Sequence, residues 1–327
     1  MHPAFSVILL TTLIGAGQGL FLALYTDQVY SVFRVIRALP PTASGLYAMG
    51  SLIALVLLAA GLLASFFHLG RPERAWRAAS QWRTSWLSRE VLLLPAFMAL
   101  VAAYGGLHHL GWDPLLARLG DSIPVHLSLL VGAAGTLAAF ALFICTGMIY
   151  ASLRFLQEWA SPLTVLNFIL LGTASGFTLA AGLAAWRWPA LTGFYGLWAI
   201  ALTLAAAVLR TASLVRNHRL RHRSSPQTAI GIRHPQIVQK AQGAMGGAFN
   251  TREFFHGRSD AWVRLVRHLF LLLGFVLPVA VMAAGLLLPA PRLLVLAFAL
   301  QYLGLVAERW YFFAEARHPQ NLYYQAA

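Results

Sequence analysis

The chain has 327 residues, of which 59% are hydrophobic and only 10% are charged, and its formal net charge is +14. This balance excludes an ordinary soluble globular domain, in which about a quarter of the residues are charged. The single cysteine, Cys145, excludes a disulfide framework and any iron–sulfur cluster bound by this chain alone, because such a cluster needs about four thiolates.

In chain order, eight apolar segments are long enough to cross a bilayer as helices. The first is predicted to be a retained span, because its leader has no Lys or Arg and no small-residue cleavage site follows it. The sequence therefore predicts an all-α bundle of eight transmembrane helices that forms one integral membrane domain over residues 1–327. The segments cover approximately residues 5–25, 45–67, 90–110, 124–149, 162–185, 191–209, 269–288 and 292–313.

The basic residues predict how the bundle is oriented. Of the 24 Lys and Arg residues, 19 lie in the connectors after the second, fourth and sixth spans and at the C-terminal end, and 5 lie on the other side. Short cytoplasmic loops of membrane proteins are enriched in Lys and Arg. We therefore expect both termini in the cytoplasm and the chain in the inner (cytoplasmic) membrane. The same rule explains the positive charge, so nucleic acid is not an expected partner.

Three titratable residues stand where predicted spans meet the cytoplasmic leaflet. His68 ends the second span, Glu90 begins the third, and His268 directly precedes the seventh. A membrane-embedded organic redox centre needs groups that exchange protons near neutral pH, and histidine and a partly desolvated carboxyl serve that need. These residues are our candidates for a quinone-binding site. Helix-end residues that complement the helix dipole give the same pattern, and this interpretation stays open.

The last span carries charge within membrane depth. Its uncharged part is only the 15 residues 293–307, so Glu308 and Arg309 must lie inside the membrane if the helix is to cross it. Charge at such a position is costly and is a functional hypothesis by default. We expect a structural polar pair, with Glu308 facing into the bundle.

Two connectors on the cytoplasmic side, residues 71–89 and 210–267, are predicted to dock a partner protein. The first combines arginines with tryptophans, which also suits an amphipathic helix on the membrane surface. The second combines a basic stretch with glycine turns and an aromatic pair, which is more specific chemistry than lipid headgroups need. The candidate docking residues are Arg71, Arg74, Trp76, Arg77, Arg83, Asn250, Arg252, Phe254 and Phe255.

The spans offer few side chains to a bound metal. No predicted span has a histidine deep in its middle with a mate on a neighbouring helix, so we expect neither a b-type haem nor another metal site. Gln18 and Asn167 are amides in hydrocarbon, and we expect them to hydrogen-bond to neighbouring helices.

Several motifs make the sequence similar to a known family. They are "HPAFSVILLTTLIGAGQGL" at the start, "HLGRPERAWRA" followed by "SWLSREV", "GGAFNTREFFHG" before the seventh span, and "ERWYFFAEARHP" near the end. With them the chain resembles the membrane anchor subunits of dimethyl sulfoxide reductase over nearly its whole length. Within that family it most resembles the anchors of cytoplasmic sulfite-oxidising complexes of sulfur bacteria.

The resemblance implies a subunit that is not catalytic alone. Such anchors bind a molybdopterin catalytic subunit and a four-cluster ferredoxin-like iron–sulfur subunit, which hold these cofactors, and exchange electrons with ubiquinone or menaquinone. The histidine of the family's quinol site corresponds to His68, and its acidic partner corresponds to Glu90.

Three alternatives remain. The chain could anchor a dimethyl sulfoxide-type reductase that oxidises menaquinol, in which case electrons flow in the reverse direction. A purely structural anchor would have no quinone site. A secondary transporter would also fit eight helices with intramembrane charge, but the sequence shows no internal repeat and no paired broken helices.

Overall fold

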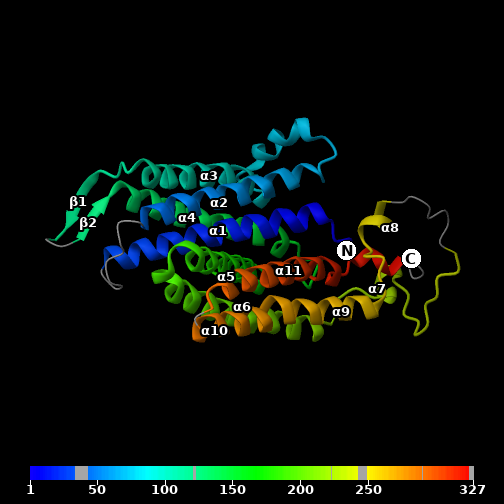
Figure 1. The fold of residues 1–327 in the computed structure, drawn as a ribbon. Helices are drawn as coiled ribbons and strands as arrows, with labels where there is room; N and C mark the ends of the chain where they lie inside the picture. Colours follow the sequence, from blue (N-terminus) through cyan, green and yellow to red (C-terminus); the bar gives the residue numbers. More distant parts are fainter. Residues whose placement is uncertain (34–42, 121–122, 222, 242–248, 289, 324–327) are drawn as a thin grey trace.

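The computed structural model describes residues 1–33, 43–120, 123–221, 223–241, 249–288 and 290–323. Within these ranges eight long helical units lie side by side along one axis (Figure 1), and all eight are long and apolar enough to cross a membrane. The prediction of an all-α membrane bundle is therefore confirmed. The units are α1 (Phe5–Val32), α2 (Ala43–Phe66), α3 (Trp86–Leu110), α4 (Leu127–Ala151), α5 (Pro162–Arg187), α6 (Thr192–His218), the continuous α9–η3–α10 unit (Asp260–Leu287) and α11 (Arg292–Glu315).

Short elements cover the two ends of the bundle (Figure 1). Both chain termini lie at one end, which we call the termini end, and there the N-terminal ammonium of Met1 donates to the carbonyl of Ala316 at 2.8 Å. The other end, which we call the hairpin end, carries an antiparallel pair of strands. The termini end holds η1 (Pro72–Gln81), α7 (Pro226–Ile230), α8 (Phe249–Glu253) and η4 (Pro319–Tyr323), and the hairpin end holds β1 (Leu115–Leu119), β2 (Ile123–His126) and η2 (Pro189–Leu191).

Helices α1 and α5 form the centre of the bundle. In their most apolar stretches 78% and 72% of the residues are buried within the protein, against 28–39% in the other six units. Glycines let their backbones touch: a Cβ atom on Gly176 would lie 1.9 Å from the carbonyl carbon of Gly19. Only glycine fits at such a crossing, as in other close helix pairs of membrane proteins.

Local sequence sets where the helices begin and end. The Ser85 side chain accepts from the Ser88 N–H at the start of α3, and Gly111 ends that helix in the left-handed conformation, with φ of 63°. Ser161 accepts from the Leu163 N–H at the start of α5, whose first residue is Pro162. These are the usual capping preferences of helices.

Three spans are longer than expected. Helix α1 continues from the predicted end at 25 to Val32, α6 continues from 209 to His218, and the seventh span begins at Asp260 instead of 269. The prediction from hydropathy ended these spans too early, because it places a boundary at a charged residue. It takes no account of partners on other helices that allow such a residue to be buried. The extensions place Asp27 and Arg210 inside the bundle.

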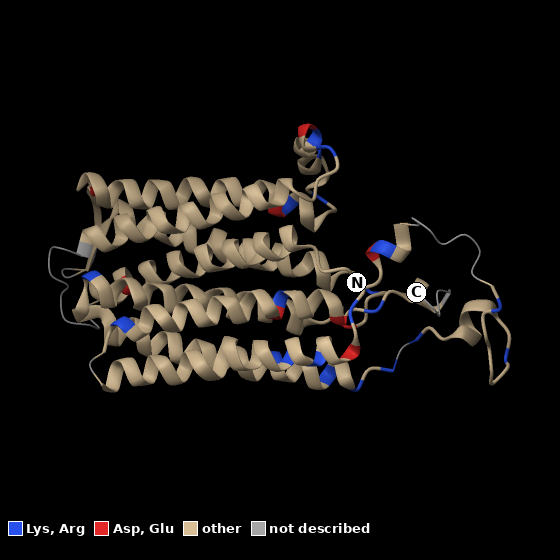
Figure 2. Cartoon of the chain, turned by 45° about the vertical axis from the view of Figure 1, so that its right-hand side comes forward, with Lys and Arg blue, Asp and Glu red and all other residues tan. Residues whose placement is uncertain are grey.

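The charges gather at one end. Lys and Arg residues are concentrated at the termini end, with few at the hairpin end (Figure 2). The short helix η1 has no buried residue, and the Trp76 side chain on it is 71% exposed. A basic, aromatic surface thus faces outward from the termini end.

Candidate functional site

Glu90 faces a cavity inside the bundle, in the half of the molecule near the termini end. It lies in the second turn of α3, and the hydroxyl of Thr146 on α4 donates to its carboxylate. The cavity has a volume of about 10 Å³, which is room for roughly one water molecule. Arg309 and Gln18 also line it, so helices α1, α3, α4 and α11 all contribute a polar side chain.

Arg309 belongs to a buried ionic cluster. Its Nε atom lies 3.2 Å from one carboxylate oxygen of Glu308, and Nε of Arg210 lies 2.7 Å from the other. All three side chains are only 3% exposed. The Arg309 guanidinium also lies over the ring of Phe168, 3.9 Å from its centre, which favours a desolvated cation. Helices α6 and α11 therefore supply two cations around one carboxylate.

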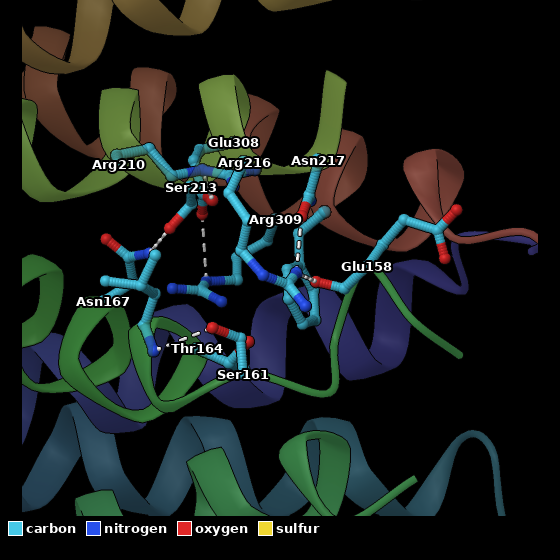
Figure 3. A pocket seen from close by; sticks show the side chains of 12 residues that line it. Glu158, Ser161, Thr164, Asn167, Arg210, Ser213, Arg216, Asn217, Glu308 and Arg309 are labelled. Carbon is cyan, nitrogen blue, oxygen red and sulfur yellow. Dashed lines mark hydrogen bonds and ion pairs between the residues drawn. The ribbon is translucent and has the colours of Figure 1, made fainter. Parts of the chain in front are cut away.

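A second cavity, also about 10 Å³ in volume, continues from this cluster toward the termini end. Arg309 lines both cavities. Figure 3 shows the polar side chains around the second one, where the Asn167 amide donates to the hydroxyl of Ser213 at 2.7 Å. Arg216 donates to carbonyls of the α4–α5 connector, at 3.0 Å to Gln157 and 3.2 Å to Ala160. The two cavities form a polar zone that extends from Glu90 to Arg216.

Several buried donor and acceptor atoms in this zone have no regular hydrogen-bond partner among the described residues. Nε and one terminal nitrogen of Arg210, one oxygen of Glu308 and the amide oxygen of Asn167 make no hydrogen bond of regular geometry with the described residues, although the charged groups are within ion-pair distance. Buried polar groups of this kind normally find a partner, often water. The zone therefore offers hydrogen-bond partners to water molecules in the two cavities.

The two predicted histidines lie outside both cavities. His68 is on the exposed turn that follows α2, and desolvation by its surroundings lowers its pKa. His268 lies on an exposed face of α9, with its Nδ1 atom 2.7 Å from the carbonyl of Arg264 on the same helix. Of the candidates from the sequence, the structure brings Glu90, Glu308 and Arg309 to adjoining cavities, and it does not bring His68 or His268 there.

The predicted docking residues divide into two groups. Those of the first connector, Arg71, Arg74, Trp76, Arg77 and Arg83, are all exposed. The segment around α8 instead packs on the ends of its own chain. The ring of Phe254 stacks on that of His318 at 3.7 Å, and the Asn321 side chain donates to the Phe254 carbonyl at 3.0 Å. Residues 242–248 lie outside the described residues.

The predicted hydrogen bonds of Gln18 and Asn167 to neighbouring helices are confirmed, whereas the burial of Arg210 was not predicted. Gln18 donates to the Ala139 carbonyl of α4 at 2.9 Å, and Asn167 reaches α6. Arg210 was expected in a connector because the sixth span was predicted to end before it. The signal was present in the spacing of Thr203, Arg210 and Ser213, which lie on one helical face and are all buried.

No metal site is seen in the part of the chain that the structure describes, where no group of three or more His, Cys, Asp or Glu residues could hold an ion. Cys145 is buried as a free thiol.

Comparison with known proteins identifies the family. The model of the DMSO reductase anchor subunit (DmsC) matches residues 1–234. The chain belongs to the DMSO reductase anchor subunit family. It is also 59% identical over 326 residues to a sulfite dehydrogenase subunit of Allochromatium vinosum, covering 100% of this chain and 99% of that protein. The resemblance read from the motifs is thus confirmed, and this family member is a multi-pass membrane anchor of an oxidoreductase complex.

Proposed function

We propose that the chain is the quinone-reactive anchor of a three-subunit molybdoenzyme that oxidises sulfite. The relative at 59% identity is named as a sulfite dehydrogenase subunit, which supports this substrate. The chain has a single cysteine, so the iron–sulfur clusters belong to a partner subunit. We assign the molybdopterin to the catalytic partner subunit. Electrons pass from sulfite through the iron–sulfur subunit to a quinone held by this chain.

The observation that carries the proposal is that Glu90 and Arg309 face the same buried cavity. Reduction of a quinone to a quinol takes up two electrons and two protons, and negative charge develops on the two carbonyl oxygens. A guanidinium stabilises such charge by hydrogen bonding, and a carboxyl group delivers the proton. Arg309 serves the first role and Glu90 the second, while the partner's clusters supply the electrons.

Protons reach Glu90 from the termini end in this proposal. The second cavity, which shares Arg309 with the first, leads in that direction. We place the termini end in the cytoplasm on the basis of its Lys and Arg residues. Proton uptake by the quinone and oxidation of sulfite then occur in the same compartment. Turnover of the complex therefore moves no charge across the membrane.

Quinone binding requires movement of the lining side chains, because the Glu90 cavity has room for about one water molecule. Leu10 on α1 and Phe143 on α4 are apolar members of the lining. Rotation of such side chains opens space for a ring without breaking the ionic cluster. His68 stays in the proposal as a proton-exchanging group at the termini end, outside the cavity, and His268 as a further one.

The soluble partners dock on the termini end in this proposal. The exposed arginines and tryptophans of the first connector offer a surface for an acidic iron–sulfur subunit. The α8 segment with Asn250, Arg252 and Phe255 borders the same end.

Turnover of the intact complex tests the assignment of Glu90. The Glu90→Gln variant should lower sulfite-to-quinone activity by about 100-fold or more, as expected for loss of a general acid. Activity with a soluble dye, which bypasses the membrane subunit, should stay unchanged. Asp113→Asn is the matched control, because Asp113 is partly exposed at the hairpin end, away from the cavity and from the docking surface. Equal loss of both activities would mark Glu90 as structural instead.

Three further measurements separate the alternatives. His68→Arg should lower the quinone-linked activity alone if His68 exchanges protons for the site. Molybdenum and iron should copurify with the chain, and their absence would favour a transporter. If the complex reduces dimethyl sulfoxide with menaquinol and does not oxidise sulfite, the chain is the anchor of a reductase, in which electrons flow from the quinol to the soluble subunits.

A further inference from the structure

Another buried carboxyl lies near the hairpin end, far along the bundle from Glu90. Asp27 of α1 is 0% exposed. Among the described residues, none of the ion pairs involves it. An ionised carboxylate in hydrocarbon is costly unless a cation neutralises it. Glu308 meets this requirement with two arginines, whereas Asp27 has no such partner in the described structure.

Phenol groups surround Asp27 on two helices. The hydroxyl of Tyr47 on α2 donates to Oδ2 of Asp27 at 3.0 Å. Tyr195 on α6 lies close enough for a side-chain interaction with the same carboxyl. Even so, the Tyr195 hydroxyl and Oδ1 of Asp27 make no hydrogen bond of regular geometry, and both groups are fully buried. One carboxyl oxygen is thus unpartnered within the described residues.

A half-buried histidine lies between this carboxyl and the hairpin end. The ring of His108 on α3 packs 4.7 Å from the rings of both Tyr47 and Tyr104, and its Nε2 atom has no hydrogen-bond partner among the described residues. An imidazole can take up and release protons near neutral pH. The imidazole of His108 is thus in ring contact with two tyrosines, one of which, Tyr47, hydrogen-bonds to Asp27.

Hydrogen bonds tie the rest of this region to the surface. Tyr104 donates to Gln28 at 2.9 Å, and the Gln28 amide donates to Ser128 at 2.7 Å. Ser128 donates to the partly exposed carboxylate of Asp113 at 2.6 Å. These bonds orient Tyr104 and Gln28 toward other partners than Asp27.

We propose that Asp27 is a proton-binding site that exchanges protons with the aqueous compartment at the hairpin end through His108. The titratable groups next to Asp27 are Tyr47 and Tyr195, and those next to this pair or beyond it are Tyr104, His108, Tyr25 and Asp113. This set contains one buried carboxylate and phenols, which is poor coordination for a metal cation and sufficient for a proton. The site is separate from the proposed quinone cavity, and it gives the chain a protonatable carboxyl toward each face of the membrane.

Infrared difference spectroscopy of the full chain, in the complex in which it purifies, tests the proposal. A protonated carboxyl group has a C=O stretching band of its own. We expect a band that changes with pH, shifts in deuterated water and is absent in Asp27→Asn. Tyr47→Phe keeps the ring and removes the hydrogen bond to Oδ2, so it should move this band to higher frequency. That variant also tests the site if Asp27→Asn fails to assemble.

The route is tested by the rate at which the band shifts after transfer to deuterated water. His108→Phe keeps an aromatic ring and removes the proton carrier, so exchange should slow by at least about tenfold. The band of Glu90, identified with Glu90→Gln, is the internal reference and should exchange at an unchanged rate. Unaltered exchange of the Asp27 band in His108→Phe would overturn the route. A band that is insensitive to pH, or one that responds to replacing sodium with choline, would overturn the proton site itself.

Discussion

The two ends of the bundle bury charge in different ways. Near the termini end, Glu308 is enclosed by Arg210 and Arg309, and the three groups neutralise most of one another's charge. Near the hairpin end, Asp27 is equally buried but is surrounded by tyrosines. In a bilayer an acid is tolerated either with a cation beside it or with a proton on it. The first arrangement fixes charge in place, and the second allows it to change.

The largest effect should come from removing the carboxylate of the ionic cluster. Glu308→Gln leaves Arg210 and Arg309 as buried, unpaired cations, so we expect the free energy of unfolding to fall by about 3–5 kcal/mol. Thermal unfolding of the purified complex in detergent measures this. Glu315→Gln is the matched control with a smaller loss, because Glu315 is 15% exposed and 3.9 Å from Arg210. Equal stability of Glu308→Gln and wild type would show that solvation by water, and not the ion pairs, stabilises the two buried arginines.

The next largest loss of stability should come from disrupting the close contact between α1 and α5, the two central helices of the bundle. Gly176→Ala places a methyl group 1.9 Å from the backbone of α1, so the helices must separate, at a cost of about 1–3 kcal/mol. Gly106→Ala is the control, because nothing lies within 4 Å of a Cβ atom there. If the two variants are equally stable, α1 and α5 do not cross as closely as the structure places them.

The same two regions show what the sequence could predict. The eight spans and the intramembrane position of Glu308 and Arg309 follow from hydropathy and span length. Arg210 and Asp27 could not be placed in this way, because a hydropathy boundary treats a charged residue as the end of a span. Their burial depends on partners from other helices, such as Glu308 on α11 and Tyr47 on α2.

The candidate site divides along the same line. Glu90 was predicted from its position at a helix start, and it faces a cavity. The same reasoning selected His68 and His268, which line neither cavity. Position along a helix gives the depth of a residue in the membrane, whereas the face it presents depends on how the helices pack around it.

A smaller effect is expected at Asp27. A carboxyl group that carries a proton is nearly the same in shape and charge as an amide, so Asp27→Asn should change the free energy of unfolding by less than about 1 kcal/mol. Measured beside Glu308→Gln, it compares a neutral site with an ionic one in a single chain. A loss as large as that of Glu308→Gln would mean that Asp27 is ionised and paired, and would remove the contrast between the two ends.

The smallest effect should be a pH-dependent loosening at the termini end. Burial lowers the pKa of the Met1 ammonium to about 6, and desolvation also lowers the pKa of His256 and of His318, whose ring stacks on Phe254. A basic group with a lowered pKa binds more protons when unfolded, so its contribution to stability grows as pH rises and is lost as pH falls through the folded pKa.

Amide hydrogen exchange measures this loosening. Protection of the Phe254 N–H, which donates to the Asn250 carbonyl at 3.0 Å, should fall between about pH 8 and pH 5, after correction for the intrinsic exchange rate. Amides of the β1–β2 hairpin, which has none of these three groups, should keep their protection over the same range. The variant His318→Phe keeps an aromatic stack on Phe254 without a titrating ring, so it should lose less protection in acid than the wild type does. An equal loss at both ends would indicate that the whole bundle weakens in acid. A loss at the termini end alone indicates that the packing of α8 on the chain ends depends on neutral amine and imidazole groups, at the same end as the proposed docking surface.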